Sequence, residues 1–326
     1  MFSLSKNTCD LIERDILPHL YELNCASHVL PSGATVIDMG VHAPGGWEAA
    51  RLFTLVTLSG LGEGRFSRME IGGVTLPTVD VTLSRPQEAS LSSQFSAWKI
   101  AKSGAYQLPG FGSGPARALA RDDGVARMWH YQDRYHKTAL AIQSAELPGD
   151  ALAEEISARC GVTPENIYLL AATTGSLVGC VQIAARMPEV SLWGLGHQGF
   201  PLERVVSFSG YGPVPPVTSD ELVAMDRVNT ATLYGSVARY TVDCEDAEIA
   251  RVMPHMAFSD TRHFGRTFAE IYDEAERDIF KMDVDVHKVA VVEVTNLRTG
   301  RTFKAGRIGG DMLLKSYFGS GENGRQ

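Results

Sequence analysis

Two charged residues near the middle of the chain have the types and spacing to form a paired carboxylate–guanidinium site. Arg186 and Glu189 stand three positions apart, so in a helix both would lie on one face. Most such pairs are solvated, but this one follows the apolar stretch 177–185, which predicts a largely buried helix. Pro188 should bend or end that helix and leave Glu189 in a turn. We therefore single out this pair as a candidate site.

A second candidate is the glycine-rich segment 110–117, which reads Gly-Phe-Gly-Ser-Gly-Pro-Ala-Arg. Glycine permits unusual backbone angles, and Pro115 suits the first position of a helix. The unpaired amides of such a helix start attract anions, and Arg117 would add a positive charge. The alternative is a plain turn into a helix, with Arg117 on the surface. The spacing leaves both interpretations open.

The segment 194–199 matches the G-x-G-x-x-G pattern of dinucleotide-binding proteins. That function needs a strand before the glycines and a helix after them. Here the preceding residues are helix-like, and Phe200-Pro201 follows directly. The pattern favours a plain loop. A nicotinamide-dependent oxidoreductase stays an alternative that strand–turn–helix geometry would support.

Composition excludes several classes of function. The chain has 326 residues, of which 30 are basic and 38 acidic, and its net charge is −8. This charge argues against nucleic acid and against an anionic membrane surface as partners. The five cysteines form no C-x-x-C pair and the nine histidines no H-E-x-x-H motif, so we expect neither a disulfide framework nor a metal site. Without a signal peptide or a long apolar run, a cytoplasmic protein is expected.

The elements that must position these residues alternate between strands and helices. This order favours the α/β class (mixed with α+β), with sheets layered against helices. Strands are predicted at 34–38, 74–83, 138–143, 166–171 and 288–295, with a hairpin around 298–300 leading to 301–308. Helices are predicted at 8–24 (capped by Thr8 or Asp10), 47–58, 89–101, 148–160, 177–186 and 267–281, and a loop at 210–216. We divide the chain near residue 147, into an N-terminal domain 1–147 and a C-terminal domain 148–326.

Segments spread over nearly the whole chain, in one order, resemble the methenyl-tetrahydromethanopterin cyclohydrolase family. The likeness is carried by residues 36–41, 46–51, 76–79, 93–94, 97–98, 112–118, 164–168, 176–179, 182–183, 234–235, 299–300 and 305–306, together with Arg186-x-x-Glu189. The resemblance implies two α/β-type domains with a pterin in a cleft between them. It also implies a homo-oligomer, trimeric in some members.

The activity that the resemblance implies is the reversible hydrolysis of 5,10-methenyl-tetrahydromethanopterin to N5-formyl-tetrahydromethanopterin. This is a one-carbon step in methanogenesis or in formaldehyde oxidation. The tetrahydromethanopterin derivative is the substrate, and no metal or prosthetic group is implied.

Residue roles follow from the same resemblance. Glu189 would orient and deprotonate a water molecule, and Arg186 would keep that carboxylate ionised and help to place the water. The residues expected to contact the substrate are Glu48, Ser93, Gln94, Trp98, Gly112, Ser113, Gly114, Arg117 and Tyr234.

The chain departs from the family pattern at two places. Relatives usually have two small apolar residues where this chain has Met187-Pro188, and they often have Asp where it has Thr230. The proline could turn Glu189 away from Arg186. An alternative is therefore a divergent member that binds a pterin without efficient hydrolysis.

Overall fold

The computed structural model describes residues 2–100, 110–278 and 281–319, which form two compact units. The first unit contains Met1–Gly64 and Leu83–Gln182, and the second contains Arg65–Thr82 and Ile183–Gln326. Each unit is thus assembled from two separate stretches of chain. The expected division near residue 147 falls inside the first unit, between a strand and a helix.

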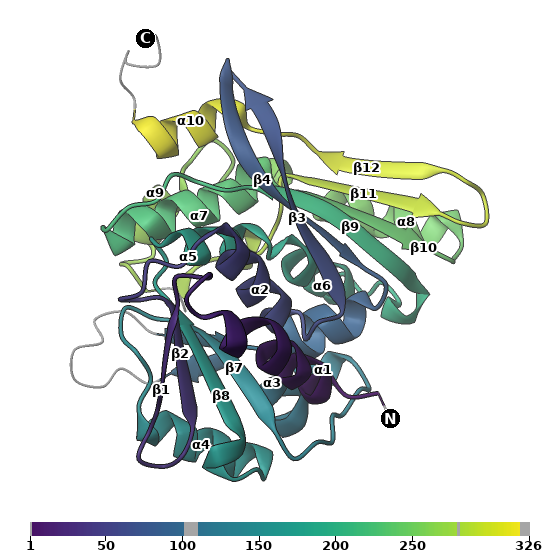
Figure 1. Cartoon of the computed structure of the whole chain (residues 1–326). Coiled ribbons are helices and arrows are strands. Elements are labelled where there is room, and N and C mark those ends of the chain that lie inside the picture. Colours follow the sequence, from purple (N-terminus) through teal and green to yellow (C-terminus); the bar gives the residue numbers. More distant parts are fainter. Residues whose placement is uncertain (1, 101–109, 279–280, 320–326) are drawn as a thin grey trace. The chain divides into compact units, whose positions relative to one another are not determined.

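The first unit is built on a six-stranded mixed sheet, visible in purple and teal in Figure 1. In the order across the sheet, its strands are β1 (Ala26–Val29), β2 (Thr35–Gly40), β8 (Ile167–Ala172), β7 (Thr138–Gln143), β6 (Gly110–Ser113) and β5 (Trp98–Ile100). The central strands β2, β8 and β7 are parallel, and the others pair antiparallel. The central strands are almost continuously buried, as is typical of parallel strands covered on both faces.

Helices complete the first unit. They are α1 (Leu4–Leu11), α2 (Trp47–Thr57), α3 (Pro115–Ala120), α4 (Asp150–Cys160) and α5 (Leu177–Ala184), the last of which runs into the second unit. Two segments are wider, π-type helices, Ile12–Ile16 and Gln87–Gln94. Short 3₁₀ turns lie at Leu17–His19, Ala126–Met128 and Pro164–Asn166.

A buried carboxylate closes the loop that follows β2. Asp38 is 4% exposed and accepts hydrogen bonds from four consecutive backbone N–H groups, those of residues 40–43, at 2.8–3.1 Å. Backbone donors in such a tight loop have no strand or helix partner, so the side chain supplies one. Asp38 therefore holds the loop between β2 and α2 in one conformation.

The second unit has its own six-stranded mixed sheet. In the order across the sheet, its strands are β12 (Thr302–Gly306), β11 (Val291–Asn296), β10 (Val237–Val242), β9 (Val205–Pro213), β4 (Val74–Leu83) and β3 (Gly62–Ile71). Strands β10 and β11 are parallel, β9 is antiparallel to β10, and β12 is antiparallel to β11. Because β3 and β4 come from the N-terminal half, this sheet unites distant parts of the sequence.

Helices of the second unit are α6 (Met187–His197), α7 (Glu221–Gly235), α8 (Asp246–Val252), α9 (Phe268–Glu274) and α10 (Gly310–Phe318). Short 3₁₀ turns lie at Leu202–Arg204, Met253–His255, Phe258–Asp260 and Val284–Val286. Aromatic and aliphatic side chains of α7, α9 and α10 form one buried cluster that includes Tyr234, Phe268 and Leu313.

Two mixed sheets layered with helices confirm the α/β class. The strands predicted at 74–83, 138–143 and 166–171 agree closely with β4, β7 and β8, and the hairpin around 298–300 is present as β11 and β12. The helix predicted at 47–58 is α2, and Pro115 begins α3 as expected.

Four predictions of local structure were wrong. The first helix begins at Leu4 with Ser3 as its cap, not near Thr8. Residues 89–101 do not form one helix, because the π-type turn ends at Gln94 and Trp98–Ile100 pairs with β6. The expected loop 210–216 includes the end of β9, and the expected helix 267–281 ends at Glu274. Residues 101, 279 and 280 of these segments lie outside the described residues.

Candidate active site

The Arg186–Glu189 pair lies where one helix ends and the next begins. Helix α5 stops at Ala184, and α6 starts at Met187 with Arg186 as its cap residue. Pro188 is the second residue of α6, where a missing N–H costs no helical hydrogen bond. The proline does end the first helix, as predicted, but Glu189 lies in the first turn of a new helix rather than in a loop.

The pair is buried and its two members face each other. Nη1 of Arg186 donates to both carboxylate oxygens of Glu189, at 3.1 and 3.0 Å. The exposed fractions of the two side chains are only 9% and 6%. A carboxylate in the first turn of a helix is also favoured by the helix dipole. The arrangement places a carboxylate acceptor in a sheltered position, where it could accept a proton from a water molecule.

Strand β9 lets the joint between α5 and α6 lie close to the sheet. A Cβ atom at Gly212 would lie 2.3 Å from the carbonyl oxygen of Ala184, and one at Gly210 would lie 3.2 Å from Cγ of Met187. Only residues without a side chain fit there. These glycines were predicted to lie in a loop, but they belong to β9, and their alternation with Tyr211 was a signal for a strand whose glycine face packs closely against another element.

Two of the segments expected to bind substrate meet in the first unit. The N–H group of Gly114 donates to the carbonyl oxygen of Ser93 at 2.9 Å. The hydroxyl of Ser93 donates to the carbonyl oxygen of Thr57 at 2.6 Å, and Gln94 beside it is fully buried. The structure thus brings the predicted segments 93–94 and 112–117 together.

Glycine is required at two positions of the second segment. Gly114 has a φ of +126°, in the region that favours glycine, and a Cβ atom at Gly112 would lie 2.8 Å from a methyl group of Leu140. Ser113 between them lies on β6, is 1% exposed and is paired with Ala141 in the sheet.

Arg117 points into the first unit. Its guanidinium donates to both carboxylate oxygens of Asp123, at 3.0 and 2.7 Å, and to the carbonyl oxygens of Leu91 and Ser93, both at 3.1 Å. The residue is 1% exposed. These bonds tie the start of α3 to the segment that contains Ser93. Neither of the two sequence interpretations placed Arg117 in such a buried network.

Trp98 and Glu48, also in the first unit, lie in contrasting environments. Trp98 on β5 is 1% exposed and belongs to an apolar cluster, with the guanidinium of Arg159 3.5 Å from its ring centre. Glu48 is exposed in the first turn of α2 and accepts a hydrogen bond from Arg51 at 2.8 Å. Their predicted contacts with the substrate stay predictions.

Tyr234 lies in the core of the second unit. Its hydroxyl donates to the carbonyl oxygen of Arg266 at 2.6 Å and accepts from the N–H group of Gly265 at 2.8 Å. Burial raises the pKa of this phenol. The same helix carries Thr230, whose hydroxyl donates to Asp226 at 3.2 Å and accepts from the N–H group of Phe268 at 3.0 Å.

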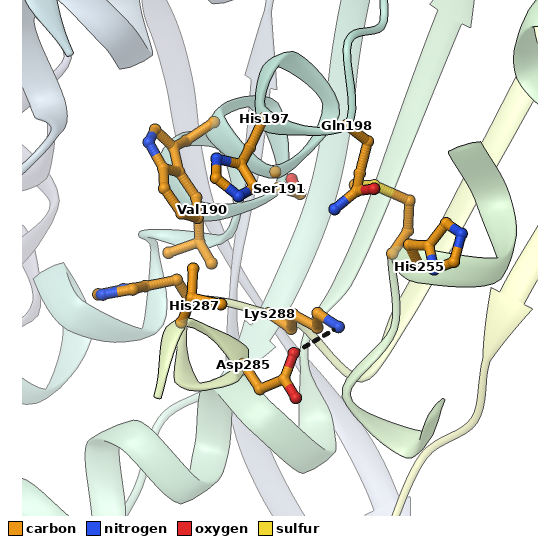
Figure 2. Close-up of a pocket in the computed structure, with 12 residues that line it drawn as sticks. Val190, Ser191, His197, Gln198, His255, Asp285, His287 and Lys288 are labelled. Carbon is orange, nitrogen blue, oxygen red and sulfur yellow. Dashed lines mark ion pairs between the residues drawn. The ribbon is translucent and has the colours of Figure 1, made fainter. Parts of the chain in front are cut away.

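A cavity of about 70 Å³ lies along another part of α6. Figure 2 shows His197 of α6 and Gln198, which follows that helix, beside this cavity, with the Asp285–Lys288 ion pair (2.8 Å) across from them. The ring of Trp193 stacks on that of His197, with centroids 4.9 Å apart. Ser191 lines the cavity, but neither Arg186 nor Glu189 does.

The G-x-G-x-x-G segment does not have dinucleotide-binding geometry. Gly194 and Gly196 lie inside α6, near its C-terminal end, with no strand before them. The predicted loop at 194–199 was wrong, since most of it is helical. The nicotinamide-dependent alternative lacks the geometry on which it depended.

Comparison with known proteins identifies the family. Residues 3–317 match the family model described as Cyclohydrolase (MCH). The chain belongs to this cyclohydrolase family. It is 33% identical to the methenyltetrahydromethanopterin cyclohydrolase of Methanocaldococcus jannaschii, over 97% of this chain and 98% of that protein. The enzymes of that name from Methylobacillus flagellatus and Methanothermobacter marburgensis are 34% and 33% identical, over 88% and 91% of this chain and 87% and 93% of theirs.

The described residues of this cyclohydrolase family member lack two features. No group of three or more His, Cys, Asp or Glu side chains there could hold a metal ion. Among the same residues, no helix is long and apolar enough to cross a membrane.

Proposed function

We propose that this chain catalyses the reversible hydrolysis of 5,10-methenyl-tetrahydromethanopterin to N5-formyl-tetrahydromethanopterin. The family match over residues 3–317 supports this proposal, as do relatives of that name aligned over nearly their full length. The observation that carries it furthest in the structure is the buried ion pair between Arg186 and Glu189.

The chemistry of the substrate explains why such a pair is useful. The bridging carbon of the methenyl group belongs to a cationic amidinium and is already electrophilic. The protein must place a water molecule and accept one of its protons as the C–O bond forms. The tetrahedral intermediate then collapses: the bond from the bridging carbon to N10 breaks, N10 takes up a proton, and the second water proton leaves as the formyl C=O forms on N5. In our proposal Glu189 takes the first water proton, and the cationic Arg186 holds the carboxylate in place.

Pro188 gave the reason to consider a relative that binds the pterin without hydrolysing it. Pro188 lies in the first turn of α6, and the hydrogen bonds between Arg186 and Glu189 are present around it, so the proline does not argue against hydrolysis. We therefore propose an active enzyme.

Several finer properties are part of the same proposal. We propose a role in one-carbon metabolism, in formaldehyde oxidation or methanogenesis, a cytoplasmic location and a homo-oligomer, with a trimer favoured by the resemblance. The tetrahydromethanopterin derivative acts as substrate, and no prosthetic group takes part. Ser93, Gln94 and the segment 112–114 are proposed to contact the pterin.

The test is the loss of the methenyl chromophore, followed by absorbance. Glu189→Gln should lower kcat by about 10²–10⁴-fold, because a positioned general base contributes that much. The matched control is Glu293→Gln, which breaks a cross-strand ion pair with Arg239 (2.8 Å) in the same unit and should leave kcat unchanged.

Each other outcome has a definite meaning. Near-normal turnover by Glu189→Gln removes this residue from the reaction. A wild-type protein that binds the compound without turnover supports the non-hydrolysing alternative, and one that does not bind it refutes the proposed substrate.

A further inference from the structure

A small hydroxyl network lies under the first turn of α6. The single hydroxyl proton of Tyr240, on β10, is shared between two acceptors, the hydroxyl oxygen of Ser191 at 2.7 Å and the carbonyl oxygen of Pro188 at 3.1 Å. The Ser191 hydroxyl donates in turn to the carbonyl oxygen of Met187 at 2.5 Å. Both side chains are 2% exposed. The network therefore joins α6 to the sheet out of contact with bulk water.

The phenol stays a donor under all ordinary conditions. Burial raises the pKa of Tyr240 far above its usual value, and no charged partner opposes this shift. The ring of Phe208 on β9 packs against that of Tyr240, with centroids 5.1 Å apart. The sheet thus presents the hydroxyl to α6 from a fixed position.

The first turn of α6 needs such an anchor because it does not continue the preceding helix. The backbone of Arg186 has φ −88° and ψ 4°, which breaks the regular helical geometry. Pro188 has no N–H group with which to bond back to α5. The direction in which α6 leaves the joint therefore depends on contacts with other elements.

We propose that Tyr240 and Ser191 are positioning residues for the carboxylate of Glu189. Their hydroxyls bond to each other and to the carbonyl oxygens of Met187 and Pro188, the two residues before Glu189. Ser191 itself follows Glu189 by two positions, so the network holds the backbone on both sides of the carboxylate. The Pro188 carbonyl belongs to the peptide group that joins Pro188 to Glu189, so its bond to Tyr240 acts directly on the backbone of Glu189. The network acts through the backbone of α6 and does not touch the reacting atoms. This inference rests on the proposed function.

The test compares hydroxyl deletions in the full-length protein. Tyr240→Phe keeps the ring and removes the anchor, and it should lower kcat by about 10- to 100-fold, with KM within about twofold, because a shift of the base of up to 1 Å costs about that much. The matched control is Tyr272→Phe, a buried tyrosine of α9 in the same unit, which should leave kcat and KM within about twofold.

Ser191 gives an independent pair of variants in case Tyr240→Phe does not fold. Ser191→Ala should lower kcat as Tyr240→Phe does, and Ser191→Thr, which keeps a hydroxyl, should restore most of it. Activities are expressed per folded molecule, with folding followed by circular dichroism. A purely structural role would lower the folded fraction and leave kcat per folded molecule unchanged.

The proposal is overturned if folded Tyr240→Phe and Ser191→Ala keep the wild-type kcat, or if only KM changes. Failure of the proposed function looks different, because then neither the wild-type protein nor Tyr272→Phe consumes the methenyl compound. That result overturns both proposals.

Discussion

Replacing Arg117 by methionine should destabilise the first unit rather than weaken substrate binding specifically. Methionine fills much of the space of the arginine stem but donates no hydrogen bonds. The carboxylate of Asp123, 15% exposed, would lose its guanidinium partner, and the carbonyl oxygens of Leu91 and Ser93 would each lose a donor. The chain would then hold a largely buried negative charge without its guanidinium partner.

Removing one partner of a buried ion pair typically costs about 3–5 kcal/mol of the free energy of unfolding. The Arg117 side chain is fully buried, so we expect the free energy of unfolding to fall by about 4 kcal/mol. With a denaturant slope of about 2–3 kcal/mol/M, the urea midpoint should fall by about 1–2 M. The wild-type protein and the variant are compared by circular dichroism in urea.

A double-mutant cycle with Asp123→Asn isolates the pair. Asp123 also accepts hydrogen bonds from the N–H groups of Val125 and Ala126, at 3.0 and 2.8 Å, so its own replacement has a separate cost. We expect a coupling energy of about 2–3 kcal/mol between the two substitutions. A variant Arg117→Met that is as stable as the wild-type protein but has a raised KM would refute this reasoning and restore Arg117 as a ligand for the substrate.

Two further predictions concern the first unit. Asp38→Ala removes the acceptor for the N–H groups of residues 40–43 and should cost at least about 3 kcal/mol, measured by urea unfolding, whereas a loss below about 1 kcal/mol would show that water replaces the carboxylate. The hydrogen bond from Lys137 holds the pKa of Glu13 below its usual value, so the unfolded chain binds more protons in that window and stability rises with pH there. The urea midpoint of the wild-type protein should therefore exceed that of Glu13→Gln above about pH 4.5 and lose this advantage in stronger acid, and a difference independent of pH would contradict the assignment.

The candidate pair could be predicted only in part. Its spacing indicated a shared helix face, and the apolar residues before it indicated burial, and both features are present. The expected loss of helix at Glu189 was wrong, because proline is as compatible with the first turn of a new helix as it is disruptive inside an old one. The residues 177–189 alone do not distinguish these outcomes.

Arg117 shows a different limit. Pro115 correctly indicated the start of a helix, because its fixed backbone angle suits that position. The predicted glycine-rich turn before it was wrong, since Gly110–Ser113 pair with neighbouring strands as β6. The destination of the arginine side chain was not predictable in the same way. It depends on the fold of residues 121–128, which places Asp123 beside the guanidinium, and on the carbonyl oxygens of Leu91 and Ser93.

What the sequence determined by itself is therefore local. Alternation of apolar residues indicated β4, a short apolar run indicated β8, and proline marked where helices begin, because each effect acts within a few residues. Only the tertiary structure decided that Tyr240 lies under Pro188, a residue 52 positions away, or that Gly212 makes room for Ala184. Such contacts depend on the order of the strands in the sheet. The residues next to a buried hydroxyl in the sequence do not indicate which distant group it will bond to.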